Sequence, residues 1–243
     1  MSDNFENGFF WELYKDLERQ FQSFLEYVPY LEYNENVYSF KLLNLILSIG
    51  GHIDSAFKEM ARYPQFSNNE ECQKILDNMK ESEENIKKGK TPKTIGISLC
   101  LRAFEKEYKL SKRRVKFKCL PKREDVTPFK PYNPRTKAPE WWEIYNGLKH
   151  DVSLNIQKAN LRNTRDALAA AFLLNVSHKP AAIRLYDYNI MKPQLRKGNE
   201  LAKVQAPIGN SRKTVMDMLE NQGILPGFTE TPLFIFNHWI AWK

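Results

Sequence analysis

Apolar residues recur at steps of three and four along two long segments, which is the spacing of a single buried helix face. The first segment spans residues 9–27 and ends before Pro29; its apolar members are Phe10, Leu13, Leu17, Phe21 and Phe24. The second begins at Ser39, a residue type that caps helix N-termini, and continues to about Tyr63. Its apolar seam consists of Leu42, Ile46, Ile49, Ile53, Phe57 and Met60. The pattern predicts two amphipathic helices, each with one buried stripe.

Shorter patterns predict further helices. Charged residues dominate segment 67–90, which indicates a surface helix, and Pro92 starts a fourth helix with apolar residues down to Phe104. Pro139 opens a helix in the stretch APEWWEIYNGLKHD, residues 138–151, and the alanine-rich residues 159–175 predict the next one.

The predicted fold class is therefore all-α (mainly), an antiparallel helical bundle. We assign residues 1–179 to one helical domain and residues 180–243 to a C-terminal extension whose structure the pattern does not define. The closing segment PLFIFNHWIAWK predicts either a strand or a docking arm.

A strongly basic segment interrupts the helices. Residues Lys109–Arg123 contain eight basic residues and no acidic one, whereas the whole chain has 37 basic and 29 acidic residues. The formal net charge of +8 therefore resides in this segment. Three cations alternate with three apolar residues there, and this period of two predicts a short β-ribbon with one charged face. The cations are Arg114, Lys116 and Lys118, and the apolar residues are Val115, Phe117 and Cys119. With the proline-rich loop after it, the insertion covers residues 109–139.

The basic ribbon has two interpretations. One is an edge strand that lysines keep soluble. The other is a nucleic-acid contact, in which Arg113, Arg114, Lys116 and Lys118 neutralise phosphates and the affinity falls steeply with salt.

The amino-acid composition limits the classes of protein to which the chain can belong. Hydrophobic residues make up 42% of the chain and aromatic residues 13%, enough for a substantial core. Three scattered cysteines form no disulfide framework, so we expect reduced thiols in a cytoplasmic protein. The N-terminus has no signal-peptide pattern, and no apolar run is long enough to cross a membrane. The histidines and cysteines lack metal-ligand spacing, so we expect neither a metal site nor a cofactor.

The segment 138–151 carries the candidate chemistry. In a helix, four of its residues share a core face: Trp141, Tyr145, Leu148 and Val152. Asn146 and His150 lie one turn apart on roughly the opposite side, with Trp142 one turn before them. Lys149 falls between the two faces, and Asp151 follows the histidine.

These groups suit attack of an RNA 2′-hydroxyl on its own phosphate without a metal. A histidine can move a proton near neutral pH, a lysine can hold a phosphate, and an asparagine can orient an oxygen. A surface histidine near a helix end also has a plain structural interpretation, either a favourable contact with the helix dipole or a place in a dimer interface.

The same segment resembles a known family. WWEIYNGLKHD, followed by ANLRNTRDALAAAFLLN, is similar to the terminal helices of HEPN-type domains, and NVYSFKLLNLILSIGGHIDSAFKEM is similar to their second helix. The resemblance covers roughly residues 10–176. It implies a helical bundle of HEPN type, a homodimer, and often a ribonuclease site across the dimer interface.

The HEPN site motif is an arginine, often followed by a polar residue, with a histidine a short distance beyond. His150 matches the histidine and Asn146 the polar residue. Where the arginine would fall, the chain has Glu143, Ile144 and Tyr145, so it departs from the motif. Lys149 could supply the charge, although it lacks the planar donor fork of arginine.

Two hypotheses follow. In the first, the chain is a HEPN-like, metal-independent ribonuclease that uses His150, Asn146 and Lys149, and the resemblance implies a role in toxin–antitoxin systems or antiviral defence. In the second, it is a non-catalytic dimeric helical module that binds RNA, a nucleotide or a protein partner.

Two features of the second helix bear on this site. Asp54 and Lys58, four residues apart, form either a plain ion pair or a pair that faces Asn146 and His150 and orients the histidine. The glycines Gly50 and Gly51 favour close helix packing over a phosphate cradle, because no strand–loop–helix context surrounds them.

Overall fold

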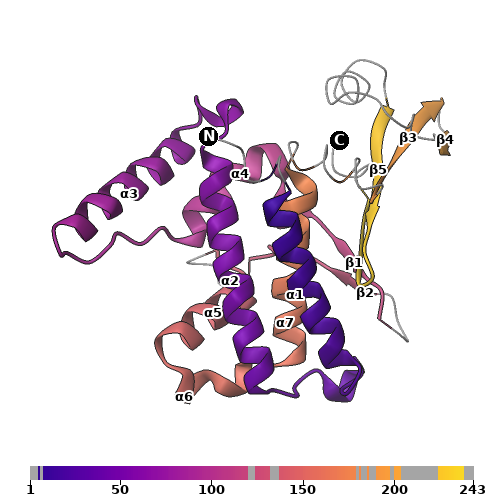
Figure 1. Cartoon of the computed structure of the whole chain (residues 1–243). Helices are drawn as coiled ribbons and strands as arrows, with labels where there is room; N and C mark the ends of the chain where they lie inside the picture. Colours follow the sequence, from indigo (N-terminus) through magenta and orange to yellow (C-terminus); the bar gives the residue numbers. More distant parts are fainter. Residues whose placement is uncertain are drawn as a thin grey trace.

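A computed structural model of the chain shows a group of helices packed beside one antiparallel sheet (Figure 1). The structure describes residues 5, 8–119, 124–131, 137–178, 181, 185, 190–197, 200–203 and 224–237. The mainly helical fold with a small β insertion, as the sequence predicts, is confirmed.

Three long helices form the centre of the molecule: α1 (Phe9–Leu25), α2 (Phe40–Ala61) and α7 (Leu161–Ser177). Helix α2 begins where the sequence predicts, because the Ser39 hydroxyl accepts a hydrogen bond from the Leu42 amide at 3.1 Å. All six residues of its predicted seam are fully buried. Helix α7 packs against α1, α2, α5 and the strands β1 and β6, which explains why its alanine-rich sequence is buried on nearly every side.

Helices α3 (Glu70–Lys87) and α4 (Ile97–Tyr108) pack against each other beside this centre. The predicted start of α4 at Pro92 is wrong: residues 91–96 are not helical, and the extended backbone of Gly96 delays the helix to Ile97. Helices α5 (Glu140–His150) and α6 (Val152–Asn155) complete the bundle on another side (Figure 1).

Six strands form the sheet, in the order β2-β1-β6-β5-β3-β4. The strands are β1 (Val115–Phe117), β2 (Glu124–Val126), β3 (Met191–Lys197), β4 (Glu200–Lys203), β5 (Ile224–Glu230) and β6 (Phe234–Asn237). The basic ribbon pairs with the last strand, with Lys116 opposite Ile235 and Phe117 opposite Phe234. Strand β1 is therefore an interior strand, so the edge-strand interpretation is wrong.

A buried carboxylate on α1 fastens the β5–β6 turn to the bundle. Oε1 of Glu18 accepts hydrogen bonds from the Thr231 hydroxyl at 2.5 Å and from the Leu233 amide at 3.1 Å. Burial raises the pKa of Glu18, and these two hydrogen bonds oppose that shift. The carboxylate thus satisfies polar groups of a turn that the helices cover.

Helices α2 and α5 approach closely at a glycine. A Cβ atom built on Gly50 would lie 2.3 Å from Cδ2 of Tyr145, whereas one built on Gly51 would meet nothing within 4 Å. The predicted packing role is confirmed for Gly50. Gly51 has open space around it instead.

Candidate functional site

The predicted site lies at the C-terminal end of α5, which ends at His150. Asp151 has an extended backbone, with φ −150° and ψ 94°, and it caps α6. Its carboxylate accepts hydrogen bonds from the Ser153 hydroxyl at 2.7 Å and the Leu154 amide at 3.2 Å, and these lower the pKa of Asp151. Asp151 therefore supports the turn between the two helices. Because the chain turns here, Val152 leaves the face of α5 and is exposed, against the prediction of a core position.

Three candidate residues lie on the surface of this last turn. Asn146 is half-buried, and Lys149 and His150 are exposed. The Lys149 ammonium lies 6.0 Å from the centre of the Tyr145 ring, so it stays beside the helix that carries the other two groups. The helical geometry that places Asn146 one turn before His150 is formed.

The aromatic residues of α5 are buried. Tyr145 lies on the core face as predicted, and both burial and the charge of Asp54 raise its pKa. Trp142 was expected on the exposed side, but only 6% of it is exposed. Its ring packs against Trp141 and Tyr145, with centroid distances of 5.6 and 5.0 Å, so Trp142 belongs to the core and offers no free stacking surface.

Asp54 and Lys58 form the plain ion pair that was one of the two alternatives. Their charged atoms are 2.5 Å apart, and each side chain is about one third exposed. No hydrogen bond between Asp54 and His150 occurs in the described part of the chain. The ion pair joins two residues one turn apart on α2. The negative charge of Asp54 also raises the pKa of Tyr145.

The basic ribbon is divided between structural and exposed cations. Arg113 is buried; its Nε donates to the Tyr108 carbonyl at 2.8 Å and its guanidinium lies over the Phe236 ring at 6.0 Å. Burial lowers the pKa of Arg113 to about 10. This arginine joins α4 to the sheet, which corrects its assignment to a nucleic-acid surface.

The remaining ribbon cations point outward to different degrees. Arg114 and Lys116 are exposed on either side of buried Val115, which confirms the predicted alternation. Lys116 stands opposite Asp125 of β2, and Lys118 binds Glu230 at 2.6 Å. An acidic neighbour therefore neutralises Lys118, and a second one lies across the strand pair from Lys116.

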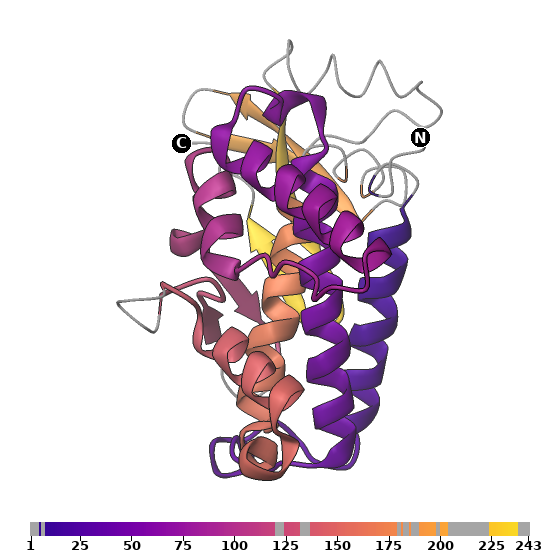
Figure 2. The same ribbon diagram turned by 90° about the vertical axis from the view of Figure 1, so that its left-hand side faces the viewer.

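The two predicted parts of the site do not share a surface. Figures 1 and 2 show the α5–α6 corner and the strands β1 and β2 on different sides of the central helices. The ribbon cannot hold the phosphates of a nucleotide bound at His150 in the same copy of the chain.

Sequence reasoning missed a group of exposed aromatic residues at the α6 end of the bundle. The segment after α1 is held beside the start of α7: the Leu161 amide donates to the Val37 carbonyl and the Arg162 amide to the Glu35 carbonyl, both at 3.1 Å. Helix α6 and the α1–α2 connection lie together at this end in both views (Figures 1 and 2).

We call this surface the aromatic end and define it by Tyr27, Tyr33, Tyr38, Phe40 and Leu154, which are all exposed. Tyr33 is 78% and Phe40 is 75% exposed. Exposed cations accompany them: Lys41, Lys149, Lys158 and Arg162. The stretch EYNENVYSF carries the signal that could have found this surface, because three aromatic residues stand there among polar ones, outside any apolar helix seam.

Comparison of the chain with protein-family models, with curated proteins and with solved structures gives no match. Within the described ranges, no three histidine, cysteine or acidic side chains come together as metal ligands. No helix of the described residues is long and apolar enough to cross a membrane.

Proposed function

We propose that the chain is a HEPN-like protein that binds single-stranded RNA at the aromatic end. The observation that carries this proposal is the meeting of exposed rings with the exposed last turn of α5 at one end of the bundle. Tyr33, Tyr38 and Phe40 offer faces on which unpaired bases can stack, and Lys149 and His150 lie on the adjoining helix end.

Stacking and charge supply the affinity in this proposal. Each base stacked on an aromatic side chain contributes about 1–3 kcal/mol to the binding free energy. Such contacts do not depend on the nucleotide sequence, because every base has an aromatic face. Lysine and arginine at the same end neutralise phosphates, and release of counterions makes the binding weaker as salt rises. A double-stranded RNA keeps its bases stacked on each other, so it cannot use the exposed rings.

Removal of the rings is expected to weaken RNA binding. Tyr38→Ser together with Phe40→Ser should lower the affinity for a single-stranded oligouridine by at least about thirtyfold, because two stacking contacts of about 1–3 kcal/mol each are lost. Fluorescence anisotropy measures the change. Ser39 remains in place, so the cap of α2 is preserved.

The matched control changes the other basic surface. Arg114→Gln with Lys116→Gln leaves the aromatic end intact and is expected to alter the affinity less than twofold. A large loss in this control, with none in the Tyr38 and Phe40 variant, would move the binding surface to strand β1 and reject the aromatic end.

Metal-independent cleavage of RNA is a second candidate, favoured by one specific observation. The imidazole of His150 is exposed one turn from Asn146 and next to Lys149. In this candidate the imidazole takes the proton of the 2′-hydroxyl, whose oxygen attacks the adjacent phosphorus and breaks the bond from phosphorus to the 5′-oxygen of the next nucleotide. The proton then passes to that leaving oxygen, and Lys149 and Asn146 hold the non-bridging phosphate oxygens. A homodimer through α5, as the HEPN resemblance implies, would add the groups of a second copy.

Incubation of the protein with mixed RNA in EDTA tests cleavage. We expect products with 2′,3′-cyclic phosphate ends, and we expect His150→Ala to abolish them while leaving the unfolding transition unchanged, because the ring is exposed. Intact RNA that is nevertheless bound would reject the catalytic candidate and leave the binding proposal standing. Light scattering on the same sample tests the homodimer.

A further inference from the structure

Four exposed cations follow one another from the end of α4 into β1, on a surface that neither proposal above uses for binding. Every exposed side chain from residue 108 to residue 117 is basic: Lys109, Lys112, Arg114 and Lys116. The other side chains of this stretch are buried, apart from half-buried Ser111. We call these four residues the four-cation surface.

The backbone arranges the four side chains as two adjoining pairs. Lys109 precedes the 3₁₀ helix η3 (Leu110–Lys112), and the Lys112 amide donates to the Lys109 carbonyl at 3.0 Å. Residues three apart in such a helix lie on the same side. Arg114 and Lys116 follow in extended chain, where alternate residues share one face and lie about 7 Å apart.

Lys109 occupies a position that favours glycine. Its backbone is left-handed, with φ 47° and ψ 41°, at the end of α4. A residue with a Cβ atom is less stable than glycine in this conformation. The chain therefore keeps a basic side chain on this surface at a cost in stability.

The four cations are not neutralised by ion pairs. None of them forms one with another residue in the part of the chain that the structure describes. Asp125 stands opposite Lys116 and offsets part of its charge. Lys109, Lys112 and Arg114 are therefore the main free cations of the surface.

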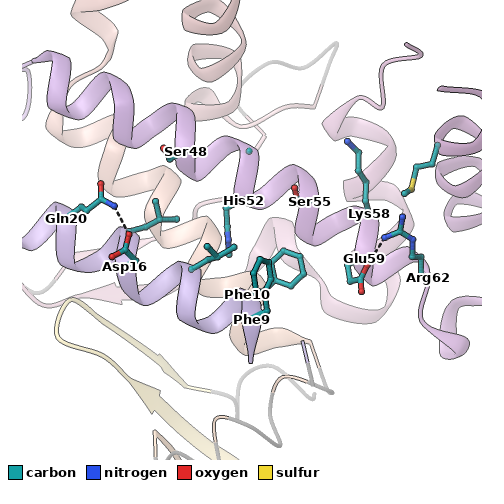
Figure 3. A pocket seen from close by; sticks show the side chains of 14 residues that line it. Phe9, Phe10, Asp16, Gln20, Ser48, His52, Ser55, Lys58, Glu59 and Arg62 are labelled. Atoms are coloured by element: carbon teal, nitrogen blue, oxygen red, sulfur yellow. Dashed lines mark hydrogen bonds and ion pairs between the residues drawn. The ribbon is translucent and has the colours of Figure 1, made fainter. Parts of the chain in front are cut away.

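The groove between α1 and α2 shows the opposite arrangement (Figure 3). Glu59 and Arg62 bind each other there at 2.7 Å, and Asp16 accepts a hydrogen bond from the Gln20 amide at 2.7 Å. Leu13 stands on the rim and is 40% exposed, against its predicted core position. These polar groups already have partners, unlike those of the four-cation surface.

The surroundings of the four cations favour a phosphate backbone over a protein partner. No large apolar side chain is exposed between residues 87 and 151 in the described ranges. Protein interfaces depend on buried aromatic or aliphatic anchors, whereas nucleic-acid interfaces are polar and strongly positive. A duplex covers its bases and presents regularly spaced phosphates, so it needs no exposed ring on the protein.

We propose that the four-cation surface binds the phosphate backbone of a nucleic-acid duplex. The contact is electrostatic and independent of nucleotide sequence. It lies apart from the aromatic end, so a duplex and a single strand can be bound by the same copy of the chain.

Fluorescence anisotropy of the full chain with a DNA duplex of about 20 base pairs tests this surface. DNA lacks the 2′-hydroxyl that cleavage needs, so the probe stays intact whether or not the chain is a ribonuclease. The logarithm of the affinity should fall with the logarithm of the salt concentration with a slope of about −3, because each main cation contributes about −0.9. Lys112→Gln with Arg114→Gln should reduce this slope to about −1.

Lys109→Gly separates binding from stability. We expect this variant to bind the duplex more weakly, with a slope shallower by about one, because a phosphate contact is lost. Its thermal midpoint should stay the same or rise, because glycine suits the left-handed backbone. Unchanged duplex affinity in this variant would show that Lys109 has no part in binding and would count against the proposal.

Lys74→Gln with Lys88→Gln is the matched control. It removes the same charge from α3, where both lysines are in ion pairs, and should leave the slope near −3. The Tyr38 and Phe40 variant should bind the duplex as the unsubstituted chain does, so this proposal and the single-stranded RNA proposal fail independently. Three results would overturn the four-cation surface: no duplex binding at low salt, equal slopes in the control and the Lys112 and Arg114 variant, or displacement of the duplex by poly-glutamate of equal charge, which would assign the surface to an acidic protein.

Discussion

Gly50→Ala is expected to destabilise the chain by about 3 kcal/mol, near the upper end for overpacked cores. The new methyl group would lie 2.3 Å from the Tyr145 ring, which is itself buried, so either the ring or the helix must move. Chemical denaturation followed by circular dichroism measures the loss. Because Tyr145 belongs to α5, the same substitution should also disturb the helix end that carries Asn146 and His150.

The neighbouring glycine provides the matched control. Gly51→Ala places a methyl group in open space within the same helix, so it should stabilise the chain by up to about 1 kcal/mol through helix propensity. The two alanine variants are therefore expected to shift the free energy of unfolding in opposite directions. Equal stabilities would contradict the close contact between α2 and α5.

Acid is expected to destabilise the chain strongly between pH 7 and pH 5. Burial lowers the pKa of His52 to about 4 and that of His178 to about 3, from 6.5 in an unfolded chain. Below pH 6.5 the unfolded state binds these protons and the folded state does not, so stability falls as the pH falls. Each ring lowers the free energy of unfolding by about 1.36 kcal/mol for every pH unit below its unfolded pKa. Together the two rings should lower it by about 4 kcal/mol between pH 7 and pH 5.

A single substitution isolates one of the rings. His178→Gln should reduce the slope of stability against pH by about 1.4 kcal/mol per unit below pH 6, since one proton fewer is taken up on unfolding. His150→Gln should retain the steep slope, because both buried rings are still present. Glu18, whose pKa is raised by burial, acts in the opposite direction at acidic pH and is common to all three proteins. A shallow slope in the unsubstituted chain would show that the two rings are accessible to protons.

Local patterns predicted the helices well because each helix buries one continuous stripe. The seam of α2, its cap at Ser39 and the helical segment that became α5 follow directly from residue spacing. The sheet was harder to predict, because its register depends on pairing between residues far apart in sequence, such as Phe117 with Phe234. The spacing of residues around Lys116 could show that charged and apolar side chains alternate along the strand. It could not show which strands lie on either side of it.

The candidate site was predictable only in part for a similar reason. The rule of one turn per 3.6 residues placed Asn146 and His150 on the same side of a helix. It gave no account of Trp142, whose burial depends on Trp141 and Tyr145, nor of Arg113, which the Tyr108 carbonyl holds in the interior. The aromatic end arises from tertiary contacts between residues 35–38 and residues 160–162, which no local pattern encodes.

In the proposed function, RNA binds where the aromatic rings meet the end of α5. The most direct test is a titration of isotope-labelled protein with a single-stranded oligouridine, followed through the backbone amide signals. We predict that the largest shifts fall on residues 33–41 and 146–158, and that they weaken as salt is raised. Shifts confined to residues 114–118, or none at any RNA concentration, would contradict the claim.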